Sequence, residues 1–254
     1  MRTVAIIQAR MASSRLPGKV LKEIAGQPML AHVVERVRRA SQVDEVVVAT
    51  TTDAGDEAVV AFCESRTIAV VRGDPFDVLD RYYQAARQFG AEVVVRVTAD
   101  CPLIDPGVVD LTISEFQRIG ADFAANRLPP PWKRTYPIGL DTEVCRFAAL
   151  ERAWREADQP YQREHVMPYL YDQEGRFRVA LVNHQPDYGA LRWTVDTAED
   201  LQFVRQVFAH FGECTDFTWL DVLDLIQREP NLAQINAGVQ HKTALDVDNR
   251  MDHP

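Results

Sequence analysis

The 254-residue chain lacks an excess of positive charge. Its 28 lysines and arginines are outnumbered by 37 acidic residues, which gives a net charge of −9. Proteins that bind nucleic acids or membrane surfaces usually present basic faces, so this balance argues against both kinds of partner. The acidic background also makes any local basic cluster informative.

Cysteines are few, and long apolar runs are missing. The four cysteines are widely spaced and none lies in a Cys-x-x-Cys pair, which fits neither a zinc site nor a disulfide framework. No segment approaches the roughly 20 apolar residues of a membrane span. The first apolar stretch, Val4 to Ile7, is too short for the core of a signal peptide. We therefore expect a cytoplasmic protein without a membrane partner.

Apolar strands and amphipathic helices alternate through the first part of the chain. Strands are expected at 3–8, 45–50, 68–71 and 92–97, and helices at 28–40, 56–64 and 77–89. Such alternation builds a largely parallel sheet with helices on both faces, and ligands bind beyond the carboxyl ends of its strands. The pattern predicts an α/β fold with three layers and a mixed, mostly parallel sheet.

The pattern loosens after Pro106. Strands are expected at 122–126, 141–146, 177–184 and 190–195, and helices at 198–211 and 218–228. Four prolines between Leu128 and Pro137 predict an irregular, projecting loop. We expect a single domain over residues 1–235. A small projection at about 126–183 would cover one side of the ligand site and carry a dimer contact, and 236–254 would form a loose tail.

The loop after the first strand carries most of the functional information. It reads Ala9-Arg10-Met11-Ala12-Ser13-Ser14-Arg15-Leu16-Pro17-Gly18-Lys19, and the stretch from Arg10 to Lys22 holds four positive residues and no acidic one. Arginine and lysine bind phosphate oxygens, and serine hydroxyls and backbone N–H groups add hydrogen bonds. The loop therefore suits a triphosphate, although it is neither a P-loop nor a Gly-x-Gly-x-x-Gly motif. A solvated surface loop is the alternative interpretation.

Residues 4–19 (VAIIQARMASSRLPGK) resemble the N-terminal signature of the cytidylyltransferases that activate keto-deoxy sugar acids and sialic acids, and are closest to the Kdo branch. Residues 72–82, 98–105 (TADCPLID) and 163–166 (REHV) resemble SpsF-like proteins of spore-coat polysaccharide synthesis. The resemblance runs from residue 3 to about 228. Gln8 stands where better-known branches have proline, a departure that concerns the acceptor more than the reaction class.

The resemblance implies a Rossmann-like nucleotide-diphospho-sugar transferase fold. It also implies transfer of CMP from CTP to a sugar or sugar-acid acceptor with release of pyrophosphate, in the synthesis of polysaccharide or glycoconjugate precursors. Mg²⁺ would be the cofactor, CTP and a small sugar-type acceptor the partners, and a homodimer the assembly. Three alternatives remain open. The first is a nucleotidylyltransferase for a sugar phosphate or another small acceptor. The second is a glycosyltransferase, whose usual Asp-x-Asp pattern occurs here only at 246–248. The third is a non-catalytic nucleotide-binding regulator, against which the intact set of arginine, lysine and aspartate residues argues.

Two aspartates follow expected strands. Asp100 ends the fourth strand, and Asp196 lies between the strand at 190–195 and the helix at 198–211. A carboxylate at a strand end can hold Mg²⁺ against a triphosphate, and the resemblance implies this role for both residues. The alternatives are a turn residue for Asp100 and a helix N-cap for Asp196.

The other candidates fall into two groups around this expected metal site. The residues expected to bind the nucleotide are Ala9, Arg10, Ser13, Ser14, Arg15, Lys19, Arg72, Thr98 and Asp100, of which Arg10, Arg15, Lys19 and Asp100 would be catalytic. The residues expected to bind the acceptor are Arg81, Asn126, Asp141, Glu143 and His165. Local ion pairs are the alternative for Arg72 and Arg81, and a structural role is the alternative for His165.

Overall fold

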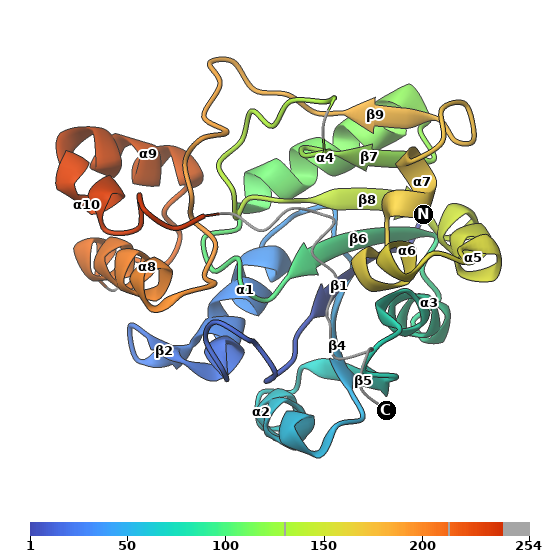
Figure 1. The fold of residues 1–254 in the computed structure, drawn as a ribbon, viewed down its shortest axis with the longest axis horizontal. Coiled ribbons are helices and arrows are strands. Elements are labelled where there is room, and N and C mark those ends of the chain that lie inside the picture. The colour runs from blue at the N-terminus through green and yellow to red at the C-terminus, as the bar shows by residue number, and fades with distance from the viewer. Residues whose placement is uncertain (130, 213, 241–254) are drawn as a thin grey trace.

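A computed structural model describes residues 1–129, 131–212 and 214–240. Its centre is a seven-stranded sheet in the order β5-β4-β1-β6-β8-β7-β9 (Figure 1). The strands are β1 Thr3–Gln8, β4 Glu45–Thr51, β5 Ala69–Gly73, β6 Val93–Thr98, β7 Phe123–Ala125, β8 Glu143–Arg146 and β9 Val179–Leu181. β1 pairs in parallel with β4 and β6, and β4 pairs in parallel with β5. β8 runs antiparallel to β6 and β7, so the sheet is mixed but mostly parallel.

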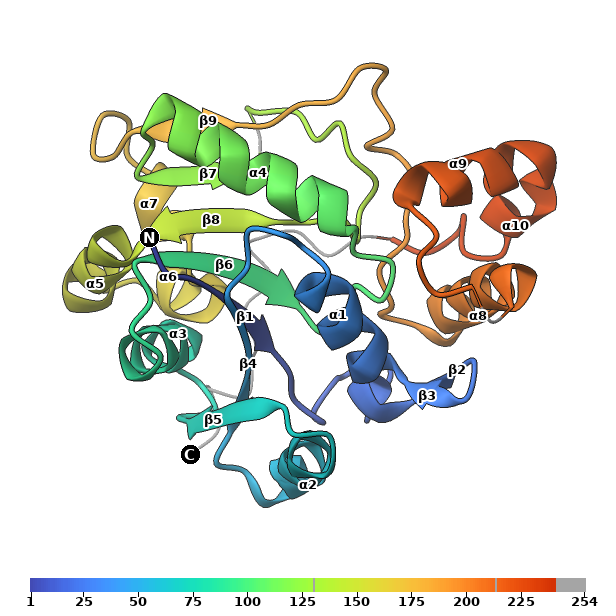
Figure 2. The same cartoon turned by 180° about the vertical axis from the view of Figure 1, so that it is seen from behind.

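Helices cover both faces of this sheet (Figures 1 and 2). One face packs against α1 Met29–Arg38, α2 Glu57–Ser65 and α4 Pro106–Ile119. The other packs against α3 Val78–Gln88, α5 Phe147–Glu156, α6 Pro160–His165 and α7 Pro168–Tyr171. Alternate residues of the inner strands are buried on opposite faces, as the near-continuous apolar pattern requires. The predicted three-layer α/β fold is confirmed.

A third apolar cluster joins the last helices to the first turns of α1 and α4 and to the loops beyond the sheet. It includes residues of α8 Ala198–Phe211 and α9 Trp219–Arg228, and α10 Pro230–Gln234 packs beside them. Thr197 and Thr218 begin the two longer helices, each forming a reciprocal capping box with an aspartate three residues later. A short hairpin of β2 Glu23–Ile24 and β3 Gln27–Pro28 lies before α1. None of the helices in the described residues combines the length and apolarity that a membrane span requires.

The strand expected at 190–195 does not form. Ile138 and Arg192 make an isolated parallel bridge, in which the Ile138 N–H donates to Leu191 O (2.8 Å) and the Trp193 N–H to Ile138 O (2.7 Å). The segment lies beyond the carboxyl end of β6, so its backbone pairs with loops instead of with a strand. The Pro-rich segment contains neither helix nor strand over residues 128–129 and 131–137, as expected.

Two further expectations concern the organisation of the domain. The region 126–183 does not stand apart from the sheet, because β8 and β9 are two of its strands. The tail was expected to be loose from residue 236, but Asn236 is buried and hydrogen-bonded. Residues 241–254, which make up most of the expected tail and include the Asp-x-Asp pattern, lie outside the described residues.

Candidate active site

The basic loop follows β1 and is tied down at both ends. The Ala9 N–H donates to Ala49 O (3.0 Å), and the Met11 N–H donates to the carboxylate of Asp56 (2.6 Å). The Gly18 N–H closes the loop by donating to Met11 O (2.9 Å). Gly18 adopts φ 67°, a left-handed conformation that favours glycine. The anchored ends hold Ser13, Ser14 and Arg15 at the carboxyl edge of the sheet, where Ser14 is exposed.

Lys19 joins the two predicted carboxylates. Its ammonium donates to Asp100 Oδ2 and Asp196 Oδ1, both at 2.8 Å, and to Val195 O at 2.9 Å. The Lys19 side chain is only 11% exposed. Burial alone would lower the pKa of Lys19, but the two carboxylates outweigh burial and raise this pKa above its usual value. Asp100 and Asp196, 96 positions apart, thus share one cation at the carboxyl end of β6.

Hydrogen bonds to the backbone of Asp100 explain why Asp196 lies close to Asp100. Asp100 O accepts hydrogen bonds from the Val195 N–H (2.8 Å) and the Thr194 hydroxyl (3.1 Å). On its other side the same segment pairs with Ile138. The segment before α8 is therefore clamped between two loops, and Asp196 follows directly after the clamp.

Gly139 is a required part of this clamp. It adopts φ 109°, and a Cβ at this position would lie 2.7 Å from the Thr194 N and Trp193 C atoms. We expect Gly139→Ala to destabilise the fold by about 2–3 kcal/mol, because strain and a backbone clash coincide. It should also weaken nucleotide binding by displacing Asp196. Thermal unfolding and CTP titration measure the two effects. Gly55→Ala is the control, since a Cβ there meets nothing within 4 Å. Equal behaviour of the two variants would refute the clamp.

Asp196 is not the helix N-cap. That position belongs to Thr197, whose hydroxyl accepts from the Asp200 N–H. The Asp196 carboxylate instead accepts from Lys19, from Arg15 at 2.9 Å and from Arg192 at 2.8 Å. Burial would raise the pKa of Asp196, but these cations, Lys19 foremost, lower it to about 2. Three cations on one partly buried carboxylate indicate an anionic site kept ionised.

Sequence reasoning missed Arg192 and Asp200. The Arg192 guanidinium forks onto both oxygens of Asp200, each at 2.9 Å, and also reaches Asp196. The four-residue spacing of Arg192, Asp196 and Asp200 was visible in the sequence. Asp200 was interpreted only as a favourable charge in the first turn of the helix, and this left its side-chain partner unidentified.

The remaining nucleotide candidates lie around the same edge but have local partners. The Arg72 guanidinium donates to Thr51 O (3.0 Å) and pairs with Glu57 (2.5 Å), which makes it a brace for the loop after β4. The Thr98 hydroxyl lies 3.2 Å from Cys101 Sγ. Ser13 Oγ accepts from the Leu16 N–H (3.4 Å). Arg10 is partly buried. The pKa of Arg81 is lowered mainly by burial and, to a smaller extent, by the positive charge of Arg10.

Glu143 and His165 lie on the face of the sheet covered by α3, α6 and α7. Glu143 is buried and pairs with Arg96 on the neighbouring strand. His165 Nε2 is buried without a hydrogen-bond partner among the described residues. Burial, followed by the positive charge of Arg96, lowers the pKa of His165, so its ring is neutral near pH 7. An unpaired buried nitrogen beside a buried ion pair is an arrangement that a polar ligand can complete.

The other acceptor candidates are engaged in structure. Asn126 is fully buried, donating to Leu140 O (2.7 Å) and accepting from the Thr142 N–H (2.9 Å), so an acceptor contact by its side chain finds no support. Both carboxylate oxygens of Asp141 pair with Arg134. Arg81 is buried and donates to the carbonyls of Asp74 and Pro75, where it supports the loop before α3.

The residues present fit a magnesium ion that is bound together with a nucleotide. Magnesium prefers oxygen ligands and usually takes one or two carboxylates, completing its shell with phosphates and water. Asp100 and Asp196 supply two such carboxylates on a common cation, and the basic loop beside them suits the phosphates. The described residues contain no cluster of three or more histidine, cysteine or acidic side chains that would form a cage by themselves.

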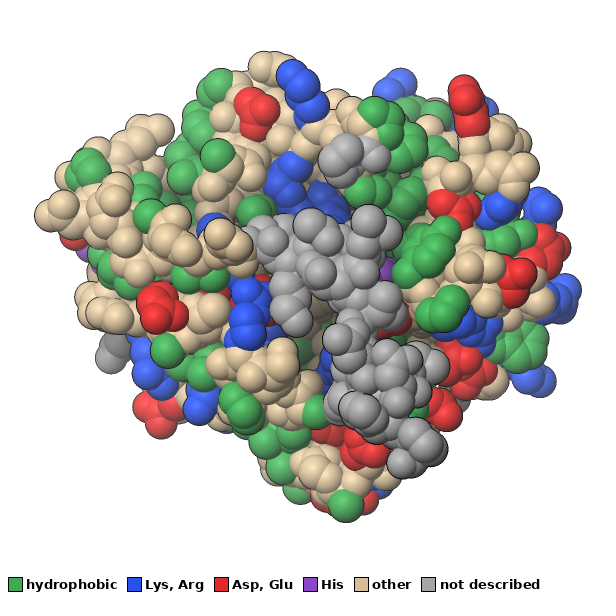
Figure 3. Space-filling view, viewed as in Figure 1, with side chains coloured by type: hydrophobic (Ala, Val, Ile, Leu, Met, Phe, Trp, Pro, Cys, Tyr) green, Lys and Arg blue, Asp and Glu red, His purple; other side chains and the backbone are tan. Residues whose placement is uncertain are grey.

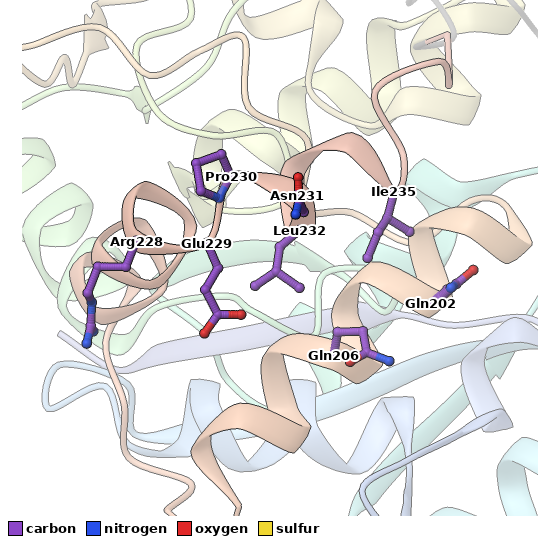
Figure 4. Close-up of a pocket in the computed structure, with 8 residues that line it drawn as sticks. All are labelled: Gln202, Gln206, Arg228, Glu229, Pro230, Asn231, Leu232 and Ile235. Atoms are coloured by element: carbon purple, nitrogen blue, oxygen red, sulfur yellow. The ribbon is translucent and has the colours of Figure 1, made fainter.

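A separate surface groove of about 490 Å³ lies between α8 and α10 (Figure 4). Its lining includes Gln202, Gln206, Leu232 and Ile235, and none of the candidate site residues. The groove is therefore distinct from the candidate active site.

On the face shown in Figure 3, basic side chains are visible near the middle of the molecule.

Solved structures of nucleotidyltransferases share this fold. A cytidylyltransferase from Leptospira borgpetersenii superposes with a TM-score of 0.87 at 30% identity, covering 95% of this chain and all of that one. Among curated proteins, an uncharacterized protein of Methanocaldococcus jannaschii is 33% identical over 98% of this chain and 100% of its own length. The spore coat polysaccharide biosynthesis protein SpsF of Bacillus subtilis is 30% identical over 90% of this chain and 95% of its own.

A 3-deoxy-manno-octulosonate cytidylyltransferase of Geobacter sulfurreducens is 45% identical over 114 residues, 45% of each chain. The family model described as cytidylyltransferase matches residues 4–239. Because this match spans nearly the whole chain, the protein belongs to the cytidylyltransferase family, and it is a CTP-dependent nucleotidyltransferase. The resemblance drawn from the N-terminal motif is confirmed.

Proposed function

We propose that this enzyme transfers CMP from CTP to a sugar or sugar-acid acceptor and releases pyrophosphate, in a reaction that requires Mg²⁺. The observation that supports the proposal most strongly is that Lys19 forms salt bridges with both Asp100 and Asp196, at the carboxyl edge of the sheet and within the basic loop. The relatives named for CMP activation of a sugar acid and for polysaccharide synthesis support the acceptor class.

The proposed chemistry is an in-line displacement at the α-phosphorus. The acceptor oxygen forms a bond to this phosphorus, the bond to the β-phosphate oxygen breaks, and the acceptor proton leaves to solvent. Bound Mg²⁺ would neutralise charge on the triphosphate and on the departing pyrophosphate. Asp100 and Asp196 would hold the ion. Arg10, Arg15 and Lys19 would bind the phosphates, with Lys19 exchanging its carboxylate partners for phosphate oxygens.

The acceptor side is proposed to lie over β6 and β8. His165, with its unpartnered Nε2, and the buried pair of Glu143 and Arg96 would meet acceptor hydroxyls or a carboxylate there. Asp141 would shape the surrounding loops through its ion pair with Arg134. Arg81 would do so through its hydrogen bond to the carbonyl of Asp74. The homodimer and the cytoplasmic location remain predictions.

Base selectivity gives the direct test of the nucleotide. In calorimetric titrations with Mg²⁺, CTP is expected to bind more tightly than UTP, ATP or GTP, by about tenfold or more, because a site that hydrogen-bonds one base leaves polar groups unpaired with another. Pyrophosphate release, measured with CTP across a panel of keto-deoxy sugar acids, neutral sugars and sugar phosphates, then identifies the acceptor. Equal affinity for all four triphosphates, or release that requires a sugar phosphate, would overturn the proposal.

A further inference from the structure

The cations that contact the Asp196 carboxylate come from two different segments of the chain. Arg15 and Lys19 belong to the basic loop, and in the proposed reaction they turn to the phosphates. Arg192 contacts Asp196 from its own segment, at 2.8 Å, and its side chain is only 7% exposed. In the proposed nucleotide complex, Arg192 would be the cation that continues to hold the Asp196 carboxylate.

Asp200 holds Arg192 in turn. This fully buried carboxylate accepts both arms of the Arg192 guanidinium. It also accepts from the backbone N–H groups of Asp196 (2.9 Å) and Thr197 (3.1 Å). Asp200 therefore fixes the backbone of Asp196 and, through Arg192, its side chain.

Asn236 completes the assembly from a distant part of the chain. It follows α10, is 4% exposed, and donates from Nδ2 to Asp200 Oδ1 (2.9 Å) and to Arg192 O (3.0 Å). Both amide hydrogens are thus used on the two residues that hold Asp196. The contacts join residues 36 and 44 positions apart.

We propose that Asn236 is a positioning residue for the metal-binding carboxylate, acting through Asp200 and Arg192, so that the segment after α10 is part of the active site. The inference rests on the proposed metal role of Asp196. Buried polar assemblies act as units, because each unmade bond leaves a desolvated group. A residue that braces a metal ligand in this way changes metal affinity without contacting the metal.

The test compares CTP affinity by calorimetry in Mg²⁺ and in EDTA. For Asn236→Ala the gain in affinity that Mg²⁺ gives should shrink by about three- to tenfold, below the ~10–100-fold typical of residues that bond a metal ligand directly. Affinity in EDTA should stay within about twofold of wild type. Mn²⁺ binding in the presence of CTP, followed by electron paramagnetic resonance, should weaken in parallel. Gln234→Ala, which removes an exposed amide at the end of α10, is the control and should match wild type.

The outcomes separate this inference from the proposed function. Wild type that gains nothing from Mg²⁺ contradicts the metal site and the inference together. Wild type that gains, with Asn236→Ala gaining equally, overturns the inference alone. Equal losses in Mg²⁺ and in EDTA, together with a lower Tm, show a merely structural role and also overturn it. If Asn236→Ala does not fold, Asn236→Ser retains one donor hydrogen and should show a smaller loss of the same kind.

Discussion

Replacing Asp100 by asparagine is expected to lower turnover by at least about 10²-fold while the protein stays folded. The substitution keeps the shape of the side chain and removes one of the two negative charges that face Lys19. Without that charge the metal is held poorly and the charge that develops on pyrophosphate is less well stabilised. Pyrophosphate release at saturating CTP, and at a Mg²⁺ concentration that just saturates the wild type, measures the effect. Part of the loss should be recovered at high Mg²⁺.

Two companion variants decide what the loss means. Asp196→Asn should reduce turnover by a similar factor, since Thr197 and not Asp196 caps α8. Asp224→Asn, at an exposed site on α9, should leave turnover unchanged. If Asp196→Asn lowers only the Tm, or if Asp100→Asn keeps full activity, the carboxylate pair does not bind the metal.

Replacing Lys19 by alanine is expected to weaken CTP binding by about 10- to 100-fold, the value of a charge-assisted contact to phosphate. CMP should bind nearly as before, because it lacks the β- and γ-phosphates. The Tm in EDTA should fall, because Asp100 and Asp196 lose the cation that they share. Added Mg²⁺ should then raise the Tm of the variant more than that of wild type.

Arg15→Ala is a second test of phosphate binding by the loop, and Lys22→Ala is the control. Arg15 contacts Asp196 at 2.9 Å and should show the same selective loss of CTP over CMP. Lys22, just beyond the loop, should show none. A Lys19→Ala variant that loses CTP and CMP equally would point to a collapsed loop and would count against phosphate binding by Lys19.

The fold was predictable where the periodicity of the sequence is unambiguous. The strand at 3–8 and the helix at 198–211 match β1 and α8 residue for residue, because β1 is buried on both faces and Thr197 marks the start of α8. The strand at 190–195 was wrong for a physical reason. An apolar run predicts a buried segment, and residues 192–195 are buried, but the run does not indicate whether the hydrogen-bond partner of the backbone is a strand or a loop.

The site was predictable as far as topology determines it. The rule that ligands bind beyond the carboxyl ends of parallel strands predicted that the basic loop and Asp100 lie in one site. Asn236 carries no local signal, since its partners are more than 30 residues away and a single asparagine near a chain end is ordinary. The hydrogen bonds of Asn126 were unpredictable for a related reason, because its two backbone partners lie on the far side of the Pro-rich loop.

A crystal structure with CTP and Mn²⁺ in place of Mg²⁺ would show directly whether Asp100 and Asp196 hold the metal. One anomalous-scattering peak is expected between Asp100 and Asp196, within about 2.0–2.3 Å of an oxygen of each and of the triphosphate. Lys19 Nζ should then lie on a phosphate oxygen instead of between the carboxylates. A metal bound elsewhere, or Lys19 still bridging Asp100 and Asp196 with CTP in place, would show that the two carboxylates do not form the metal site.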